Sequence, residues 1–208
     1  FGSWAAARGA APAELKALGL NAEFARALKD GRAAAFAADE VRRARETSIR
    51  LMGYSDPAFP PALRLHDDLP PLLYVRGELR AQDALAVAIV GSRRASVYGT
   101  MHAERFAFEL AQAGFTVVSG LAQGIDAAAH RGALKGRGRT LAVLGNGLPG
   151  IYPPEHEELA AQVAASGALV SELPIGTAPA AKNFPVRNRI IAALGLGVLV
   201  VEAARKSG

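Results

Sequence analysis

The chain of 208 residues contains no cysteine. This absence excludes disulfides, thiolate metal sites and cysteine nucleophiles, and it fits a cytoplasmic protein. Half of the residues are hydrophobic, yet no apolar run is long enough to cross a membrane, so we expect a soluble globular chain. Lysine is also scarce, with 5 lysines against 19 arginines. Arginine suits phosphate contacts and stacking on bases, but coding bias would give the same composition, and both explanations stay open.

The sequence also lacks the usual signatures of catalysis. It has no Ser-His-Asp order, no paired catalytic carboxylates, no H-E-x-x-H motif and no Walker A lysine loop. Asp126 and His130 are four residues apart, which places them on one helical face, but one aspartate and one histidine do not make a metal shell. We expect Asp126 to be a helix N-cap that orients His130 through a hydrogen bond. The chain therefore offers binding groups, and we expect no enzyme activity, no metal and no cofactor.

Composition divides the chain into three parts. Residues 1–52 are rich in alanine and predict a small all-α domain. Residues 53–83 are dense in proline and predict an extended connector with a short strand at 72–75. Residues 84–208 alternate between apolar runs and helix-like stretches. This alternation predicts an α/β fold with a mostly parallel, Rossmann-like sheet covered by helices on both faces.

The alternating region contains five predicted strands, at residues 85–90, 115–119, 140–145, 168–172 and 197–202. Four predicted helices lie between them, at about residues 100–113, 125–135, 154–165 and 187–194. The chain stops just after the last strand, whereas a doubly wound sheet normally continues. We therefore expect these 208 residues to be part of a longer protein.

The most informative loop follows the first of these strands. Residues 87–99 have the sequence VAIVGSRRASVYG, in which an apolar, β-branched run leads directly into Gly91, Ser92, Arg93 and Arg94. Ligands of open α/β sheets bind outside the carboxyl ends of the strands. A small residue, a hydroxyl and two guanidinium groups at that edge are typical of a phosphate site. The alternative is that both arginines are solvated surface residues.

A glycine motif at residues 145–150, GNGLPG, matches the G-x-G-x-x-G pattern of dinucleotide sites, and Glu172 ends the next strand 22 residues later. That fingerprint requires a helix to begin within the glycines, so that the pyrophosphate lies at the helix N-terminus. Pro149, Pro153 and Pro154 delay the helix here to about residue 154. We therefore do not expect NAD binding.

A second basic loop precedes the last predicted helix. Its residues 178–188 have the sequence APAAKNFPVRN, and three cations, Lys182, Arg187 and Arg189, lie around Phe184. Cations interleaved with a ring are typical of surfaces for single-stranded nucleic acid, because the cations follow the phosphates while the ring stacks on a base. The alternative is that Phe184 folds into the core and pins the loop. Because a helix begins near Arg187, one arginine is also a candidate for a structural role.

Six stretches follow one another in the sequence: GSRRASVYG, SGLAQGIDAAAH, LAVLGNGLPGIYPPEH, SELPIG, FPVRNRIIAAL and VVEAARKSG. Their order and spacing resemble those of the DNA-processing protein A (DprA, or Smf) family over residues 54–208. Residues 1–50 resemble only loosely the small helical SAM-like domain that many members carry. The resemblance implies an extended Rossmann-like domain in a non-enzymatic homodimer that binds single-stranded DNA. It also implies that the protein protects incoming DNA during natural transformation and loads the RecA recombinase onto it.

The resemblance further implies a DNA pocket built from the arginine of the GSR motif and the residues before the RNR motif. With neighbouring groups added, the candidate DNA-binding residues are Gly91, Ser92, Arg93, Arg94, Lys182, Phe184, Arg187, Asn188 and Lys206. The competing function is an enzyme that processes nucleotides or nucleoside phosphates on a similar scaffold. Such enzymes use a Gly-Gly-x-Gly-Thr-x-x-Glu loop, which does not occur in this sequence.

Overall fold

The computed structural model describes residues 4–65 and 68–203 and divides into two units, residues 1–46 and 47–208. The first unit contains four helices, α1 (Trp4–Gly9), α2 (Pro12–Ala17), α3 (Ala22–Lys29) and α4 (Arg32–Glu46). Its small core is formed by Ala10, Leu15 and Ala25. These helices confirm the all-α character expected near the N-terminus. The unit ends at residue 46, earlier than the predicted boundary at residue 52, because the following residues enter the sheet of the second unit.

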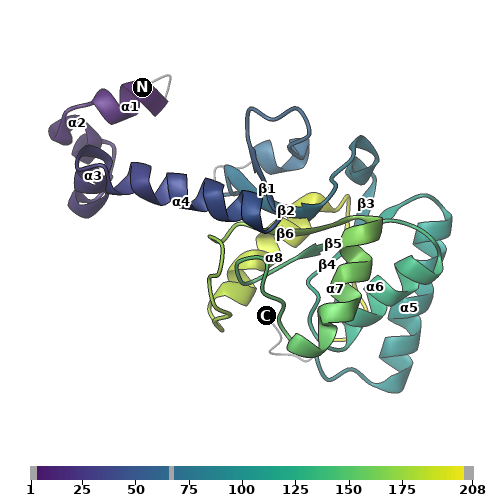
Figure 1. Cartoon of the computed structure of the whole chain (residues 1–208). Coiled ribbons are helices and arrows are strands. Elements are labelled where there is room, and N and C mark those ends of the chain that lie inside the picture. The colour runs from purple at the N-terminus through teal and green to yellow at the C-terminus, as the bar shows by residue number, and fades with distance from the viewer. Residues whose placement is uncertain (1–3, 66–67, 204–208) are drawn as a thin grey trace. The chain divides into compact units, whose positions relative to one another are not determined.

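The second unit is built on a seven-stranded sheet in the order β1-β2-β6-β5-β4-β3-β7 (Figure 1). The strands are β1 (Arg50–Gly53), β2 (Leu72–Gly77), β3 (Ala86–Val90), β4 (Thr116–Ser119), β5 (Thr140–Val143), β6 (Ala168–Ser171) and β7 (Val198–Val200). Neighbouring strands from β3 to β7 pair in parallel, whereas β1 and β2 form an antiparallel edge. The mostly parallel sheet confirms the predicted fold class.

The proline-rich segment, residues 53–83, is not a separate connector, because it contains β2, and β2 completes the sheet together with β1, which ends at residue 53. Met52 of β1 and Leu73 of β2 are fully buried, and Phe59 between them joins the same core. The prolines lie between the two strands rather than inside them, so they do not interrupt strand pairing. Three short 3-10 helices also belong to this unit: η1 (Pro61–Arg64), η2 (Ala81–Ala84) and η3 (Pro154–His156).

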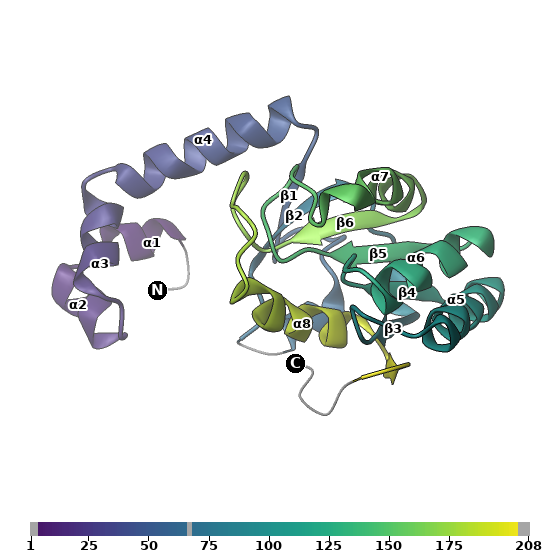
Figure 2. The ribbon, with the colours of Figure 1, turned by 90° about the horizontal axis from the view of Figure 1, so that it is seen from below.

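Helices cover both faces of the sheet, as Figure 2 shows. Three helices lie on one face, α5 (Val97–Gln112), α6 (Ile125–Lys135) and α7 (Glu157–Ser166), and α8 (Asn183–Leu194) lies on the other. The residues of β4 alternate between the two cores: Val117 packs with α5 and α6, whereas Val118 packs with Ile190 of α8. This two-sided burial explains why the strands are apolar along their whole length. Among the described residues, none of the helices is both long enough and apolar enough to cross a membrane.

At the carboxyl ends of the parallel strands, two neighbouring loops lead to opposite faces of the sheet. The loop after β5 leads to α7 on one face, and the loop after β6 leads to α8 on the other. Ligands of open α/β sheets bind where neighbouring connections diverge in this way. The helix after β6 begins at Asn183, four residues before the predicted start at 187, because Pro185 falls in the first turn, where its missing N–H is not needed.

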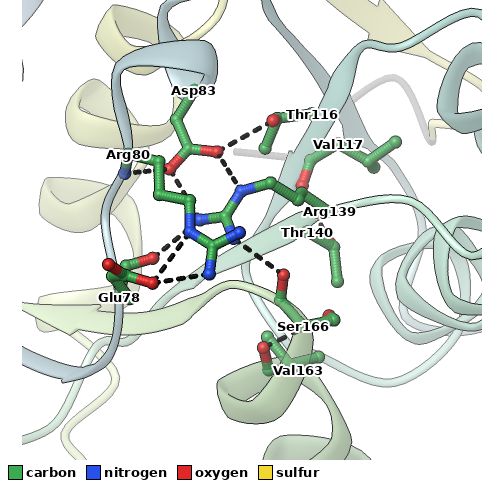
Figure 3. A network of polar contacts seen from close by, with 9 residues as sticks. All are labelled: Glu78, Arg80, Asp83, Thr116, Val117, Arg139, Thr140, Val163 and Ser166. Carbon is green, nitrogen blue, oxygen red and sulfur yellow. Dashed lines mark hydrogen bonds and ion pairs between the residues drawn. The ribbon is translucent and has the colours of Figure 1, made fainter.

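A buried ion pair lies at the other end of the sheet, where β4 and β5 begin (Figure 3). Arg139 donates through Nε and Nη2 to the two carboxylate oxygens of Asp83, each at 2.8 Å. The same guanidinium donates to the carbonyl oxygens of Ser166, at 3.0 Å, and Glu78, at 2.7 Å. Thr116 at the start of β4 donates to Asp83 at 2.9 Å. The network therefore joins β2, β4, β5 and α7 at the end of the sheet remote from the basic loops.

Candidate nucleic-acid interface

Two of the predicted DNA-binding residues meet although they come from distant loops. The guanidinium carbon of Arg93, after β3, lies 5.1 Å from the centroid of the Phe184 ring in the first turn of α8. The ring of Tyr152, from the loop after β5, lies 5.6 Å from the same ring, centroid to centroid. A cation and two aromatic rings from three connections are thus gathered at one edge of the sheet.

Phe184 combines the two roles that the sequence left as alternatives. The ring lies directly over Gly145, where an added Cβ would come within 2.7 Å of the Phe184 Cδ1 atom. Close packing on this glycine fixes the ring, and Gly145 must remain free of a side chain for the ring to lie there. The side chain is nevertheless only half-buried, so part of the ring remains open to a ligand.

An open cleft of about 90 Å³ lies beside Arg93 and Phe184. The residues that line it are Arg93, Gly120, Ala122, Gln123, Tyr152, Pro153 and Phe184. Arg93 is exposed, and 44% of the Tyr152 surface is exposed. The cleft presents an exposed cation and exposed ring surface together, which is the combination that binds a phosphate and stacks on a base.

The structure corrects the prediction that the Arg187 side chain contacts DNA, because its guanidinium points into the protein. The residue is 4% exposed, and Nη1 donates to the carbonyl oxygens of Gly120, at 2.8 Å, and Val143. Burial lowers the pKa of Arg187 to about 10, while the charge of Asp126 acts in the opposite direction. Arg187 therefore ties α8 to the ends of β4 and β5 and holds Phe184, one helical turn earlier, in the cleft.

The structure also corrects the prediction that Asp126 is a helix N-cap. Gly124, at a φ of 73°, is the N-cap, and Asp126 is the second residue of the helix, at 6% exposure. Burial raises the pKa of Asp126, and the nearby Arg187 charge lowers it. The carboxylate accepts from the backbone N–H of Ala122 at 3.4 Å, so it supports the turn beside the cleft from below.

His130 is fully buried and does not bond to Asp126. Its Nδ1 lies 2.7 Å from the hydroxyl of Thr140, and among the described residues its Nε2 has no hydrogen-bond partner. Burial, followed by the charge of Arg187, lowers the pKa of His130 to about 3, so the ring is neutral at pH 7. Within residues 4–65 and 68–203, no three His, Cys, Asp or Glu side chains form a group that could hold a metal ion.

The glycine motif at residues 145–150 is a structured loop and not a helix start. Asn146 is 2% exposed, and its Nδ2 donates to the carbonyl oxygen of Gly150 at 2.7 Å. The following α-helix begins only at Glu157, after the 3-10 turn η3. This late start confirms the delay that the prolines predicted, and the loop instead supplies Gly145 and Tyr152 to the cleft.

The remaining predicted residues occupy different positions around this edge. Gly91 and Ser92 are half-buried, and the Ser92 hydroxyl accepts from the backbone N–H of Arg94 at 3.1 Å. Arg94 and Lys182 are exposed, and Asn188 is half-buried on α8. Lys206 lies outside the described residues.

A second cavity, of about 140 Å³, adjoins Lys182. It is lined by Leu144, Glu172, Leu173, Lys182, Asn183, Val186 and Arg187. Sequence reasoning missed Glu172 and Asn183 here, and it missed Tyr152 and Gln123 in the first cleft. The sequence feature that could have identified Tyr152 is an aromatic residue next to prolines in a loop that follows a strand.

Comparison with known proteins identifies the family of this chain. A family model described as DNA recombination-mediator protein A matches residues 50–208. The chain is 51% identical to Protein Smf of Escherichia coli K12 over 151 residues, which are 72% of this chain and 40% of that protein. It is 37% identical to the DNA processing protein DprA of Bacillus subtilis over 165 residues, 79% of this chain and 56% of that protein. The chain thus spans about half the length of these relatives.

Solved structures share the fold. The X-ray structure of DNA processing protein A from Streptococcus pneumoniae superposes with a TM-score of 0.74 at 37% identity and covers 81% of this chain and 59% of that one. A structure describing the single-stranded DNA binding mode of DNA processing protein A from Helicobacter pylori has a TM-score of 0.68 at 31% identity, with coverages of 77% and 73%. The family model, the sequence identities and the fold all support the resemblance, and the chain belongs to the DNA recombination-mediator protein A family of DprA and Smf proteins.

Proposed function

We propose that this chain binds single-stranded DNA in the cleft between Arg93, Tyr152 and Phe184. The observation that carries the proposal is the placement of the Arg93 guanidinium 5.1 Å from the Phe184 ring, at an open edge of the sheet. Arg93 binds a backbone phosphate, and the exposed parts of Phe184 and Tyr152 stack on a base. A cleft that holds a ring against a base requires unpaired bases, so single strands bind in preference to duplex DNA.

The exposed cations nearby extend this surface. Arg94 lies next to Arg93, and Lys182 lies two residues before Phe184. We assign both to phosphates on either side of the stacked base, with Gly91 and Ser92 shaping the loop that presents Arg93. Asn188 and Lys206 stay candidate contacts from the family resemblance alone.

The cleft binds DNA without transforming it. Asp126 and His130, which lie on one face of α6, are both buried, at 6% and 0% exposure. Asp126 accepts from the Ala122 N–H and His130 contacts Thr140 of β5, so both side chains have structural contacts and neither reaches a phosphodiester at the surface. We therefore propose a binding role and not catalysis.

Membership of the family supports a wider role for the protein to which this chain belongs. We propose that the protein acts as a cytoplasmic homodimer, protects incoming single-stranded DNA during natural transformation and loads a RecA recombinase onto it. The family is one of recombination mediators, which supports the loading step. The relative from H. pylori supports single-stranded DNA as the ligand.

A competition experiment tests the proposal. Fluorescent oligo-dT is bound to the protein and displaced by unlabelled single-stranded DNA, by duplex DNA or by a nucleoside monophosphate. We expect single strands to compete best and the monophosphate to compete poorly. Stronger competition by the monophosphate, together with its hydrolysis, would instead favour the nucleotide-processing enzyme.

A further inference from the structure

Glu202 extends from the end of β7 to the N-terminus of α5. Its two carboxylate oxygens each accept from the backbone N–H of Ser96 at 3.1 Å. Oε2 also accepts from the Ser96 hydroxyl at 2.8 Å. Ser96 is the N-cap of α5, and its hydroxyl oxygen accepts from the Gly99 N–H at 3.0 Å. One carboxylate is therefore held by the capping residue of a helix that lies 106 positions away in sequence.

The surrounding backbone is shaped to receive this residue. A Cβ at Gly99 would overlap the Glu202 carboxylate, so the first turn of α5 leaves space for it. A Cβ at Gly91 would come within 2.7 Å of the Glu202 carbonyl oxygen. That carbonyl accepts from the Ser92 N–H at 2.6 Å. Two glycines and two serines of the GSRRASVYG loop thus surround Glu202.

The position of the carboxylate is the usual anion site of this type of sheet. A helix N-terminus carries partial positive charge and unpaired N–H groups, and it binds phosphates where a strand leads into it through a glycine-containing loop. In nucleotide-binding α/β sheets this helix follows the first parallel strand, and the ligand lies at the crevice beside it. Here α5 follows β3, and β7 pairs with β3 and delivers Glu202 to the same crevice.

We propose that Glu202 is an internal anionic ligand that fills the phosphate position at the α5 N-terminus and excludes free nucleotides from the β3–β7 crevice. The carboxylate occupies the N–H and hydroxyl donors of Ser96 and repels any second anion placed there. The Arg93 side chain on the same loop is left free for a phosphate outside the crevice. This last consequence rests on the proposed DNA-binding function, whereas the exclusion of phosphate does not.

The test is a titration with inorganic phosphate, followed by the backbone amide NMR signals of Ser96, Val97 and Gly99. In the unmodified chain these signals should not respond to phosphate. In Glu202→Ala they should shift and saturate, with binding at least about tenfold tighter than in the unmodified chain, because the donors are freed and the repulsion is gone. Glu109→Ala is the matched control: it removes an exposed acidic side chain from the same helix, paired with Arg105 through a 2.8 Å contact, and should leave the three signals unresponsive.

Two results would overturn the proposal. One is a saturable phosphate shift at Ser96 and Gly99 in the unmodified chain, a measurement that does not depend on whether any variant folds. The other is a folded Glu202→Ala protein that gains no phosphate site, or gains no more than Glu109→Ala. Since no arm of this titration contains DNA, a failure of the DNA-binding proposal would leave its result standing, and the reverse also holds.

Discussion

The guanidinium of Arg93 lies over the ring of Phe184, with 5.1 Å between the guanidinium carbon and the ring centroid. The contact joins the loop after β3 to the first turn of α8. That loop leads to α5, which lies on one face of the sheet, whereas α8 lies on the other face. A phosphate-binding group and a base-stacking group are therefore close enough to contact the same nucleotide. The buried side chain of Arg187 stabilises this arrangement by anchoring α8 to the ends of β4 and β5.

Phe184→Ala should weaken oligo-dT binding by about 1–3 kcal/mol, the usual contribution of one stacked base. The measurement is fluorescence anisotropy at fixed salt. Phe108→Ala is the control, because Phe108 is an aromatic residue of α5 that is 41% exposed and does not line the cleft. Equal affinity losses in both variants would show that the Phe184 ring is not a specific contact.

Arg187→Ala should destabilise the fold by at least about 3 kcal/mol, because it leaves the Gly120 and Val143 carbonyls without a donor and Asp126 without a nearby positive charge. Urea unfolding measures this free energy. The variant should also bind oligo-dT more weakly, since α8 and Phe184 lose their anchor. Unchanged stability combined with weakened binding would contradict the structural role and indicate direct contact with DNA.

His130 should make the chain less stable in mild acid. Its folded-state pKa of about 3 lies below the ordinary value of 6.5, so between those pH values the unfolded chain binds one more proton than the folded chain. Its stabilising contribution is complete above pH 6.5 and is lost as the pH falls toward 3, at about 1.4 kcal/mol per pH unit.

The measurement is the free energy of unfolding at pH 7 and at pH 5. The fall between these pH values should be about 2 kcal/mol smaller in His130→Gln, which cannot be protonated in this range. The comparison between the two proteins removes the contribution of all other titrating groups. An identical pH dependence in both would contradict the buried, neutral histidine.

Arg139→Ala should destabilise the chain without affecting DNA affinity. Its side chain is 10% exposed and pairs with Asp83, which is 8% exposed, so removing it leaves a buried carboxylate uncompensated at a cost of about 3–5 kcal/mol. The network, drawn in Figure 3, lies at the starts of β4 and β5, whereas the cleft lies beyond the end of β4. Oligo-dT affinity measured where the variant is still folded should equal that of the unmodified chain, and a specific loss of affinity would contradict the placement of the site.

The sequence pattern was sufficient for the parallel core of this fold, because strands buried on both faces are apolar throughout and alternate with helices. It predicted β2 as a short strand at residues 72–75 but missed β1, and a short run beside prolines does not indicate that β2 pairs antiparallel with both β1 and β6. Strand-end position and residue type correctly brought Arg93 and Phe184 to one edge.

The inward direction of Arg187 was not predictable in the same way. Its acceptors, the carbonyls of Gly120 and Val143, lie 67 and 44 positions away and carry no side-chain signature. The same holds for Glu202, whose partner Ser96 is found only when β7 pairs with β3. Side-chain direction inside a fold depends on contacts between distant segments, which local composition does not encode.

The most direct test of the DNA site is the salt dependence of oligo-dT binding in Arg93→Ala. We expect weaker binding to every sequence and a slope of log K against log salt that is shallower by about 0.7, the value for one lost phosphate contact on a single strand. Arg105→Ala removes an equally charged side chain that is 71% exposed on α5 and should leave the slope unchanged. An Arg93→Ala protein with the affinity and salt slope of the unmodified chain would contradict the account.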